Sequence, residues 1–285
     1  MKKLYFILTI ILLVATNTIQ AQNDSIYFWK EGQLIAQRSI KTADLDSITF
    51  QRPINPNGIN IPGPNVTDID GNVYASVTNC GQTWAKQNLN VSKYSDGTLI
   101  PQVIDPSQWA SRTTGAWCYY NNDPANGAIY GKLYNWYAVA GIYDAASLAN
   151  PALRKKLAPS GWHIATDAEW NTLINCLDPN SDGGNIIPNL AGGKMKATGT
   201  IEAGTGLWYE PNTGATNESG FSGLPGIIRF YTGIFPSIGF SGLWWSSSED
   251  DTADVWTRSV QYNDSNAYRN LSTKRNGLSV RCIRD

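Results

Sequence analysis

The spacing of hydrophobic and polar positions divides the chain into short elements of changing period. Side chains alternate between apolar and polar over residues 26–30 and 33–40, and Glu31-Gly32 separates the two runs. Alternation with a period of two is typical of strands, and the glycine-containing break indicates a tight turn. We therefore predict a short β-hairpin adaptor over residues 22–51, which is too small to bury a core of its own.

A proline-rich stretch follows this hairpin. Residues 52–65 contain four prolines and two glycines, a composition that favours an extended linker over a helix or a strand. The remaining residues, 66–285, have the length of one domain. The chain is thus predicted to consist of a hairpin, a linker and a single larger unit.

Two stretches of that larger unit repeat apolar residues at helical spacing. One covers residues 131–140, and the other covers residues 166–177. The second begins with Thr166 at the position of an N-cap and carries Glu169 three residues later, which is the signature of a capping box. Apolar residues from Trp170 onward then recur at intervals of three and four. We predict a helix over each stretch.

Strand signals surround these two helices. Residues 66–77 have the pattern of a hairpin with its turn at Asp70, and residues 83–89 and 242–248 have the pattern of short strands. A last hairpin is predicted over residues 255–282, and turns rich in Gly, Asn and Ser separate the elements. The pattern therefore indicates a loop-rich unit of short strands and two helices.

The N-terminus has the pattern of a secretory signal. Two lysines precede an apolar run over residues 4–15, and a small residue, Ala21, ends the segment. We predict cleavage after Ala21, so that residues 1–21 are removed and the mature chain is exported to the periplasm, the cell surface or the medium. The apolar run is too short to span a bilayer comfortably. We therefore expect no membrane insertion after the signal is removed.

Composition and charge narrow the possible partners. The chain has 22 basic and 23 acidic residues, and loss of the two N-terminal lysines would leave a net charge of about −3. A nucleic-acid partner needs a concentrated basic stripe, whereas the longest basic run is Arg154-Lys155-Lys156. We predict no nucleic-acid partner. With 11 Trp, 14 Tyr and 26 Gly but only 16% charged residues, the composition indicates an exported, loop-rich fold.

The cysteines predict two disulfide bonds if the protein is exported. They are Cys80, Cys118, Cys176 and Cys282, and four cysteines allow three connectivities. No two of them form a CxxC pair, and a zinc site would need closer ligands together with histidines. We favour the pairs Cys80–Cys118 and Cys176–Cys282, the second of which would join the helix at 166–177 to the last strand.

Candidate catalytic and metal-binding residues are few. His163 is the only histidine, and no Gly-x-Ser-x-Gly nucleophile elbow accompanies it, so we interpret it as a packed residue with a hydrogen-bonded ring. The Glu-Pro-Asn tripeptide at 210–212 matches one that calcium-dependent lectins use. Its separation from Asn263 and Asp264 is far longer than in lectins, and its surroundings are typical of a turn. We predict no catalytic residue, no metal and no cofactor.

Aromatic residues are the remaining candidates for a binding site, and they crowd the second half of the chain. An exposed aromatic platform can stack on a sugar or contact a protein. Trp244 and Trp245 are adjacent, so in a strand they would point to opposite faces, and we expect one of them to be exposed. The predicted ligand-binding residues, with a glycan or a surface protein as partner, are Trp208, Trp244, Trp245, Tyr262, Asn263 and Asp264.

Several motifs together resemble a known family. They lie at 82–89, 114–123, 130–137, 159–170, 220–226, 244–247 and 277–282. In this order they resemble the Fibrobacter succinogenes major paralogous domain, in its Bacteroidetes-type form, over residues 66–285. The N-terminal hairpin ends in Asp-Ser-Ile-Thr-Phe at 46–50, and it resembles an element that precedes varied modules in secreted Bacteroidetes proteins.

That family is in turn similar to the sulfatase-modifying-factor branch of the C-type-lectin-like fold, because of the Thr-Asp-Ala-Glu-Trp helix start at 166–170. The resemblance implies an α+β, C-type-lectin-like domain with two helices, small irregular antiparallel sheets and long loops. The formylglycine-generating enzymes of that branch use two neighbouring cysteines near the C-terminus, whereas this region offers only Cys282. The chain departs from the family at Ala158, where many members have a cysteine.

These observations predict a secreted or cell-surface binding module, without catalytic activity, for a carbohydrate or a protein. One alternative is an envelope enzyme related to the formylglycine-generating oxidases, which two reactive thiols close in space would support. Another is a structural surface protein whose N-terminal hairpin docks to envelope machinery.

Overall fold

The structure of the protein, a computed structural model, divides into two compact units. They are residues 1–53 and residues 54–285. The residues that it describes are 24–30, 33–40, 58–226 and 228–285. The signal predicted at 1–21 and the first part of the predicted linker lie outside the described residues.

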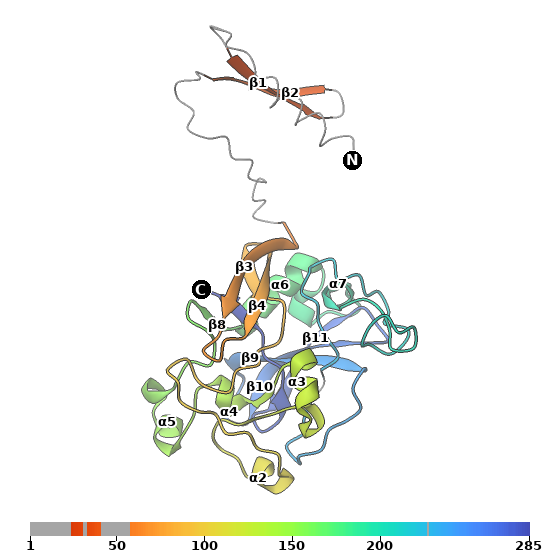
Figure 1. The fold of residues 1–285 in the computed structure, drawn as a ribbon. Coiled ribbons are helices and arrows are strands. Elements are labelled where there is room, and N and C mark those ends of the chain that lie inside the picture. The colour runs from red at the N-terminus through yellow and green to blue at the C-terminus, as the bar shows by residue number, and fades with distance from the viewer. Residues whose placement is uncertain (1–23, 31–32, 41–57, 227) are drawn as a thin grey trace. The chain divides into compact units, whose positions relative to one another are not determined.

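The first unit contains a hairpin (Figure 1). Strand β1 (Asp24–Lys30) pairs antiparallel with β2 (Gln33–Ile40), and Asp24 lies opposite Ile40. These are the two strands that the alternating pattern predicts. The register shifts once, between Phe28 and Trp29.

The larger unit is built on a five-stranded antiparallel sheet, with the strand order β3-β4-β5-β13-β8. Its strands β3, β4 and β8 are labelled in Figure 1. The strands are β3 (Ile61–Thr67), β4 (Val73–Asn79), β5 (Gln82–Ala85), β8 (Trp162–Ile164) and β13 (Cys282–Arg284). The last strand, β13, lies between β5 and β8. Segments from both ends of the unit therefore meet in one sheet.

Strand β3 contains residues whose composition predicts a linker. Its position explains the difference, because β3 is an edge strand. Proline cannot donate a backbone hydrogen bond, and an edge strand has one side on which no donor is needed. Pro62 accordingly pairs with Val77 of β4. The predicted turn at Asp70 joins the two strands, and the strand predicted at 83–89 ends earlier, at Ala85.

Two three-stranded antiparallel sheets complete the larger unit. The sheet β12-β7-β6 consists of β6 (Trp117–Cys118), β7 (Leu133–Asn135) and β12 (Gly277–Leu278). The sheet β11-β10-β9 consists of β9 (Ser241–Glu249), β10 (Asp254–Gln261) and β11 (Ala267–Thr273). Both the strand predicted at 242–248 and a hairpin within 255–282 are present.

The prediction of a helix over 131–140 is wrong. Residues 133–135 form β7, and the four-residue helix α4 (Trp136–Val139) begins only after it. All of β7 is buried, so its side chains do not alternate between apolar and polar. Without this alternation the sequence does not distinguish a strand from a helix. Asn135 then caps α4, because its Oδ1 accepts a hydrogen bond from the Ala138 N–H at 3.1 Å.

Among the residues that the structure describes, the remaining helices apart from α6 are five to seven residues long. They are α2 (Pro106–Ala110), α3 (Pro124–Tyr130), α5 (Ala145–Ala149) and α7 (Ala191–Met195), with 3-10 turns at Tyr120–Asn122, Pro151–Leu153 and Asp182–Gly184. None of the helices in the described ranges is both long and apolar enough to cross a membrane.

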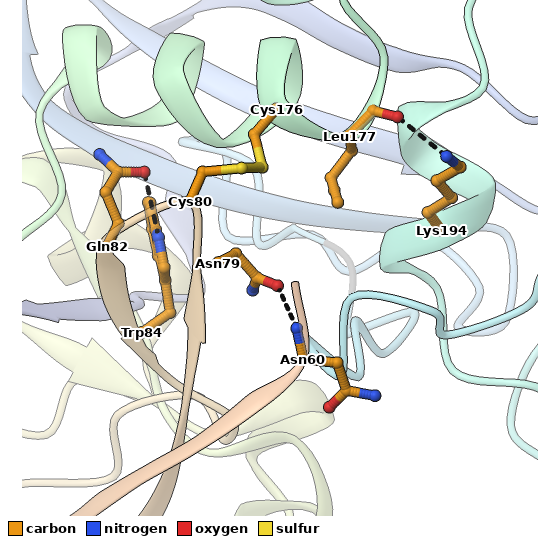
Figure 2. Close-up of a disulfide and its surroundings, with 8 residues drawn as sticks. All are labelled: Asn60, Asn79, Cys80, Gln82, Trp84, Cys176, Leu177 and Lys194. Carbon is orange, nitrogen blue, oxygen red and sulfur yellow. Dashed lines mark hydrogen bonds between the residues drawn. A yellow bond between two sulfur atoms is a disulfide. The ribbon is translucent and has the colours of Figure 1, made fainter. Parts of the chain in front are cut away.

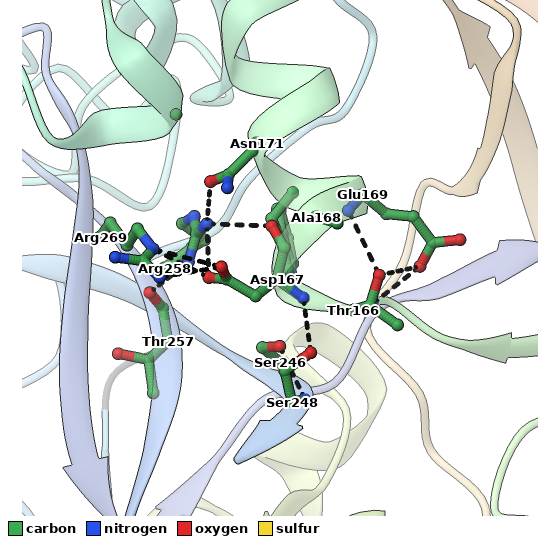
Figure 3. A network of polar contacts seen from close by, with 12 residues as sticks. Thr166, Asp167, Ala168, Glu169, Asn171, Ser246, Ser248, Thr257, Arg258 and Arg269 are labelled. Atoms are coloured by element: carbon green, nitrogen blue, oxygen red, sulfur yellow. Dashed lines mark hydrogen bonds and ion pairs between the residues drawn. The ribbon is translucent and has the colours of Figure 1, made fainter. Parts of the chain in front are cut away.

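Helix α6 (Asp167–Leu177) has the cap that the sequence predicts. The Thr166 N–H donates to Glu169 Oε2 at 2.8 Å, and the Glu169 N–H donates to Thr166 Oγ1 at 3.3 Å (Figure 3). Both halves of the capping box are therefore present. The apolar face of the helix is buried, and it consists of Trp170, Leu173, Ile174 and Leu177.

A charged network fixes the first turn of α6 to the sheet β11-β10-β9 (Figure 3). Asp167 lies 2.8 Å from Nη2 of the buried Arg258, and it accepts hydrogen bonds from Nε and Nη2 of Arg269 at 3.0 Å. Burial opposes ionisation of Asp167, but Arg269 and Arg258 outweigh it and lower the pKa of the carboxyl. The helix N-terminus also favours this negative charge.

Strand β9 lies between the two hydrophobic clusters of the larger unit. Trp244 packs in one cluster, where its ring centroid lies 6.2 Å from that of Trp170 and 5.4 Å from that of Phe221. Trp245 points to the opposite face and belongs to the other cluster, together with Trp117. Both faces of β9 are therefore covered by apolar side chains.

The disulfide connectivity differs from the predicted one. Cys80, in the turn between β4 and β5, is bonded to Cys176 in the last turn of α6 (Figure 2). Their Cα atoms are 6.2 Å apart, within the usual range for a disulfide. Cys118 in β6 and Cys282 in β13 are buried free thiols. The pairs Cys80–Cys118 and Cys176–Cys282 are therefore wrong.

The physical reason is the position of α6 relative to the sheet. The C-terminal end of the helix, and not its start, faces the tip of the β4–β5 hairpin (Figure 2). Lys194 supports the same end, because its Nζ donates to the carbonyl of Leu177 at 3.0 Å. A lysine at this position satisfies a carbonyl that the last turn of a helix leaves without a partner.

Candidate functional site

The tryptophans predicted as ligand-binding residues are core residues. Trp208, Trp244 and Trp245 are fully buried. Their indole N–H groups donate to Gly223 O at 3.2 Å, to Asn88 Oδ1 at 2.9 Å and to Tyr134 O at 2.7 Å, respectively. The prediction that they contact a ligand is wrong. The two clusters around β9 bury Trp244 and Trp245, and Trp208 belongs to the same cluster as Trp244.

The other three predicted residues follow β10 directly and remain accessible to solvent. Tyr262 and Asp264 are half-buried, and Asn263 is exposed. The Asp264 carboxylate accepts hydrogen bonds from the Asn266 N–H and the Tyr268 hydroxyl, both at 2.8 Å. This carboxylate is therefore occupied in shaping the β10–β11 connection. Tyr262 packs against the hydrophobic cluster of Trp244 and remains partly exposed, and Asn263 is exposed.

The Glu-Pro-Asn tripeptide does not present its amide to a ligand. The Asn212 side chain is buried, and its Nδ2 donates to the carbonyls of Ala197 and Gly199, each at 3.0 Å. Within the part of the chain that the structure describes, no group of three or more His, Cys, Asp or Glu residues could hold a metal ion. Asn212 instead holds together the loop that leads to Tyr209.

Tyr262 belongs to a cluster of surface aromatic rings, which we call the aromatic surface. Its members are Tyr209, Phe240 and Tyr262. The ring centroids of Tyr209 and Phe240 are 4.7 Å apart, and those of Phe240 and Tyr262 are 5.2 Å apart. Phe240 is 39% exposed, and both tyrosines are partly exposed. Three aromatic rings in contact at the surface offer a wide, amphipathic face for a ligand.

The register of the sheet brings these rings together. Ser241 of β9 pairs with Gln261 of β10, so Phe240 and Tyr262 occupy the next cross-strand positions, where side chains interact. The Tyr262 N–H donates to Phe240 O at 2.9 Å, and the Tyr209 N–H donates to Gly239 O at 3.0 Å. The aromatic surface is therefore fixed by backbone hydrogen bonds on both sides of Phe240.

Gly239 permits the close packing of Tyr209. Its φ of +98° lies in the left-handed region that favours glycine. A Cβ at this position would lie 2.6 Å from Cδ2 of Tyr209. The Tyr209 ring thus rests directly on the backbone next to Phe240.

A buried lysine holds the loops beneath the aromatic surface. The Lys196 ammonium donates to the carbonyls of Thr213, Gln261 and Asp264, each at 2.8 Å. Burial lowers the pKa of Lys196 to about 8, yet three carbonyl acceptors match the three donors of its ammonium. Lys196 therefore joins the loop at Thr213 to the end of β10 and to the β10–β11 connection. The resulting rigidity reduces the entropy that a ligand must overcome on binding.

His163 has two carboxylate partners and lies outside the aromatic surface. Its Nε2 is 2.7 Å from Glu169 Oε1, and its Nδ1 is 2.7 Å from Asp285 Oδ1. Burial favours the neutral ring, but the hydrogen bonds to Asp285 and Glu169 outweigh it and raise the pKa of His163. With both ring nitrogens bonded to carboxylates, the histidine connects β8 to the first turn of α6.

The sequence identified one of the three aromatic residues as a site residue. Tyr209 was visible as one of many aromatics in the second half, and Phe240 lacked any motif. The sequence does show an aromatic residue just before the start of one strand and another just after the end of the next, and these two strands pair with each other in the structure. Only the register of those strands shows that the residues before β9 and after β10 are neighbours.

Comparisons with known proteins identify a family for most of this unit. The model of a family described as the Fibrobacter succinogenes major domain matches residues 77–284. The matched range includes the disulfide, helix α6 and the whole aromatic surface. No curated protein and no solved structure matches the chain.

Proposed function

The chain belongs to the Fibrobacter succinogenes major domain family, and from this premise we propose that it is an exported binding module without catalytic activity. The aromatic surface carries the proposal. Tyr209, Phe240 and Tyr262 are in contact, partly exposed and rigidly held. Such a surface is suited to stack on sugar rings or to contact a protein.

Export is part of this proposal. The pattern of residues 1–21 is that of a secretory signal. The Cys80–Cys176 disulfide supports the same conclusion, because disulfides persist mainly outside the reducing cytosol. The cleavage after Ala21 is tested by measuring the intact mass of the exported protein. A protein that is found in the cytosol and still carries residues 1–21 would contradict the proposal.

We also propose that the larger unit has a C-type-lectin-like fold. The support is a set of small antiparallel sheets, a capped helix α6 and long connecting loops. The two-helix arrangement expected of such a domain is modified here, because β7 and the single turn α4 replace the first helix. A crystal structure superposed on lectin-like domains tests this assignment, and a different strand order would overturn it.

The two free thiols favour the binding module over an oxidase related to the formylglycine-generating enzymes. Burial raises the pKa of both Cys118 and Cys282 to about 12. A thiol of that pKa is almost entirely protonated at neutral pH, and the thiolate is the nucleophile. Titration of the native protein with a thiol reagent should therefore be slow at both cysteines, whereas two fast-reacting thiols would support the enzyme.

The binding proposal is tested with a glycan array and a pull-down from cell-surface extracts, using the folded and oxidised protein. A variant that combines Tyr209→Ala, Phe240→Ala and Tyr262→Ala should lose at least about 10-fold in affinity for any ligand found. Leu99→Ala removes a more exposed apolar side chain elsewhere and should bind normally. The proposal fails if neither screen yields a ligand, or if the triple variant binds as tightly as the wild type.

A further inference from the structure

A pocket is lined by residues other than those of the aromatic surface. The site, which we call the tyrosine pocket, has a volume of about 390 Å³, within the range of about 300–1,000 Å³ that is typical of small-ligand sites. Its lining includes Tyr137, Tyr231, Thr252, Lys274 and Arg275. It contains two aromatic rings and two cations, and none of its described lining residues is acidic.

One wall of the pocket is rigid because a buried arginine anchors it. Arg229 and Gly277 exchange two backbone hydrogen bonds, at 2.8 and 2.7 Å. The buried Arg229 guanidinium also donates to the carbonyls of Val103 and Ile104. The Tyr231 N–H then donates to Asn276 Oδ1 at 2.8 Å. Tyr231 is 49% exposed, so its ring is presented to solvent from a fixed backbone.

The part of the lining formed by Tyr137 and Lys274 is also held in place. Tyr137 lies in α4, between the buried residues Trp136 and Ala138. The Lys274 ammonium lies 5.0 Å from the centre of the Trp136 ring. It donates to Glu249 Oε2 at 2.6 Å and to two backbone carbonyls. Its charge is therefore neutralised, and its donors are all in use.

Arg275 is the one lining cation that has no partner among the residues that the structure describes. Its backbone is fixed, because its carbonyl accepts a hydrogen bond from Trp109 Nε1 at 2.9 Å. Its side chain is exposed, and neither a hydrogen bond nor an ion pair to a described residue engages the guanidinium. The hydroxyl groups of Tyr137 and Tyr231 likewise have no hydrogen-bond partner within the described ranges.

From this arrangement we propose that the tyrosine pocket binds a pyranose that carries a carboxylate, such as a uronic acid residue of a glycan. A pyranose has an apolar C–H face that stacks on a tyrosine ring, and its hydroxyls can bond with the phenol groups. The guanidinium of Arg275 matches a carboxylate in a bidentate geometry. The pocket shares no lining residue with the aromatic surface, so Arg275→Gln tests this proposal and the triple variant of the aromatic surface tests the proposed function.

The test compares two sugars that differ only in the carboxylate. Methyl β-D-glucuronoside and methyl β-D-glucoside are titrated into the isotope-labelled protein, and backbone and arginine side-chain resonances are followed by NMR. We expect shifts at Tyr137, Tyr231 and Arg275, with an affinity for the glucuronoside at least about 10-fold higher than for the glucoside. Arg275→Gln should bring this ratio to about 1, because it removes the charge and keeps an amide.

Two further variants separate recognition from folding. Arg284→Gln removes another exposed arginine, in β13, and should keep the preference for the acid. Tyr231→Ala should weaken both sugars by a similar factor, because each stacks on the ring. Equal binding of the two sugars, an unchanged preference in Arg275→Gln, or no shifts with either sugar up to about 20 mM would overturn the proposal.

Discussion

Removal of the Cys80–Cys176 disulfide should cause a large loss of stability. The two cysteines are separated by 96 positions in the sequence. A cross-link that closes a loop of this length lowers the entropy of the unfolded chain, and the loop-closure relation gives about 4.7 kcal/mol at 25 °C. The variant Cys80→Ala/Cys176→Ala should therefore lose about 3–5 kcal/mol of its free energy of unfolding, because measured effects often fall below the relation.

The assay is urea unfolding followed by tryptophan fluorescence, with and without a reducing agent. Reduction should lower the urea midpoint of the wild type to that of the variant. It should leave the midpoint of the variant unchanged, since the cysteines that remain there, Cys118 and Cys282, are free thiols. The larger unit also has many buried tryptophans, so the signal reports on its core.

Connectivity is tested in the same samples. Alkylation of the unfolded, unreduced protein should label two cysteines, Cys118 and Cys282, and a peptide map should show Cys80 linked to Cys176. The reasoning is refuted if no cysteine is labelled, as the pairs Cys80–Cys118 and Cys176–Cys282 would require. It is also refuted if the double variant unfolds within about 1 kcal/mol of the wild type.

Three other substitutions probe the contacts that hold the unit together. His163 has a raised pKa, so its stabilising effect is complete below the unfolded value of about 6.5 and is lost as the pH rises through the folded value. His163→Gln should flatten the pH dependence of the free energy of unfolding. The change should be no more than about 1 kcal/mol, because the ring is 38% exposed. An unchanged pH profile of urea unfolding would contradict this prediction. Gly239→Ala should lower the free energy of unfolding by about 1–3 kcal/mol, since the alanine Cβ would collide with the Tyr209 ring. Thermal unfolding measures this loss, and a gain in stability would be inconsistent with the packing. Asp167→Ala leaves Arg258 buried without its carboxylate and should cost about 3–5 kcal/mol, and a loss below about 1 kcal/mol in urea would disprove the role of the network.

The sequence predicted those elements whose signals are local. Helix α6 is recognisable because Thr166, Glu169 and the apolar positions that follow them act within one helix. The hairpin of β3 and β4 is recognisable from its turn, and the strand β9 from its apolar run. The motifs that resemble a family lie in the range that the family model matches. In each case the interacting residues are close together along the chain.

Tertiary structure alone decided which residues could form a site. Trp244 and Trp245 alternate as a strand requires, but β9 lies between two hydrophobic clusters, so both are buried. The partner of Cys80 depends on which end of α6 faces the β4–β5 turn. The aromatic surface depends on the register of β9 and β10, which brings Phe240 beside Tyr262. Burial, cross-linking and surface clusters are set by contacts between distant segments, and the local period of a sequence does not encode which segments meet.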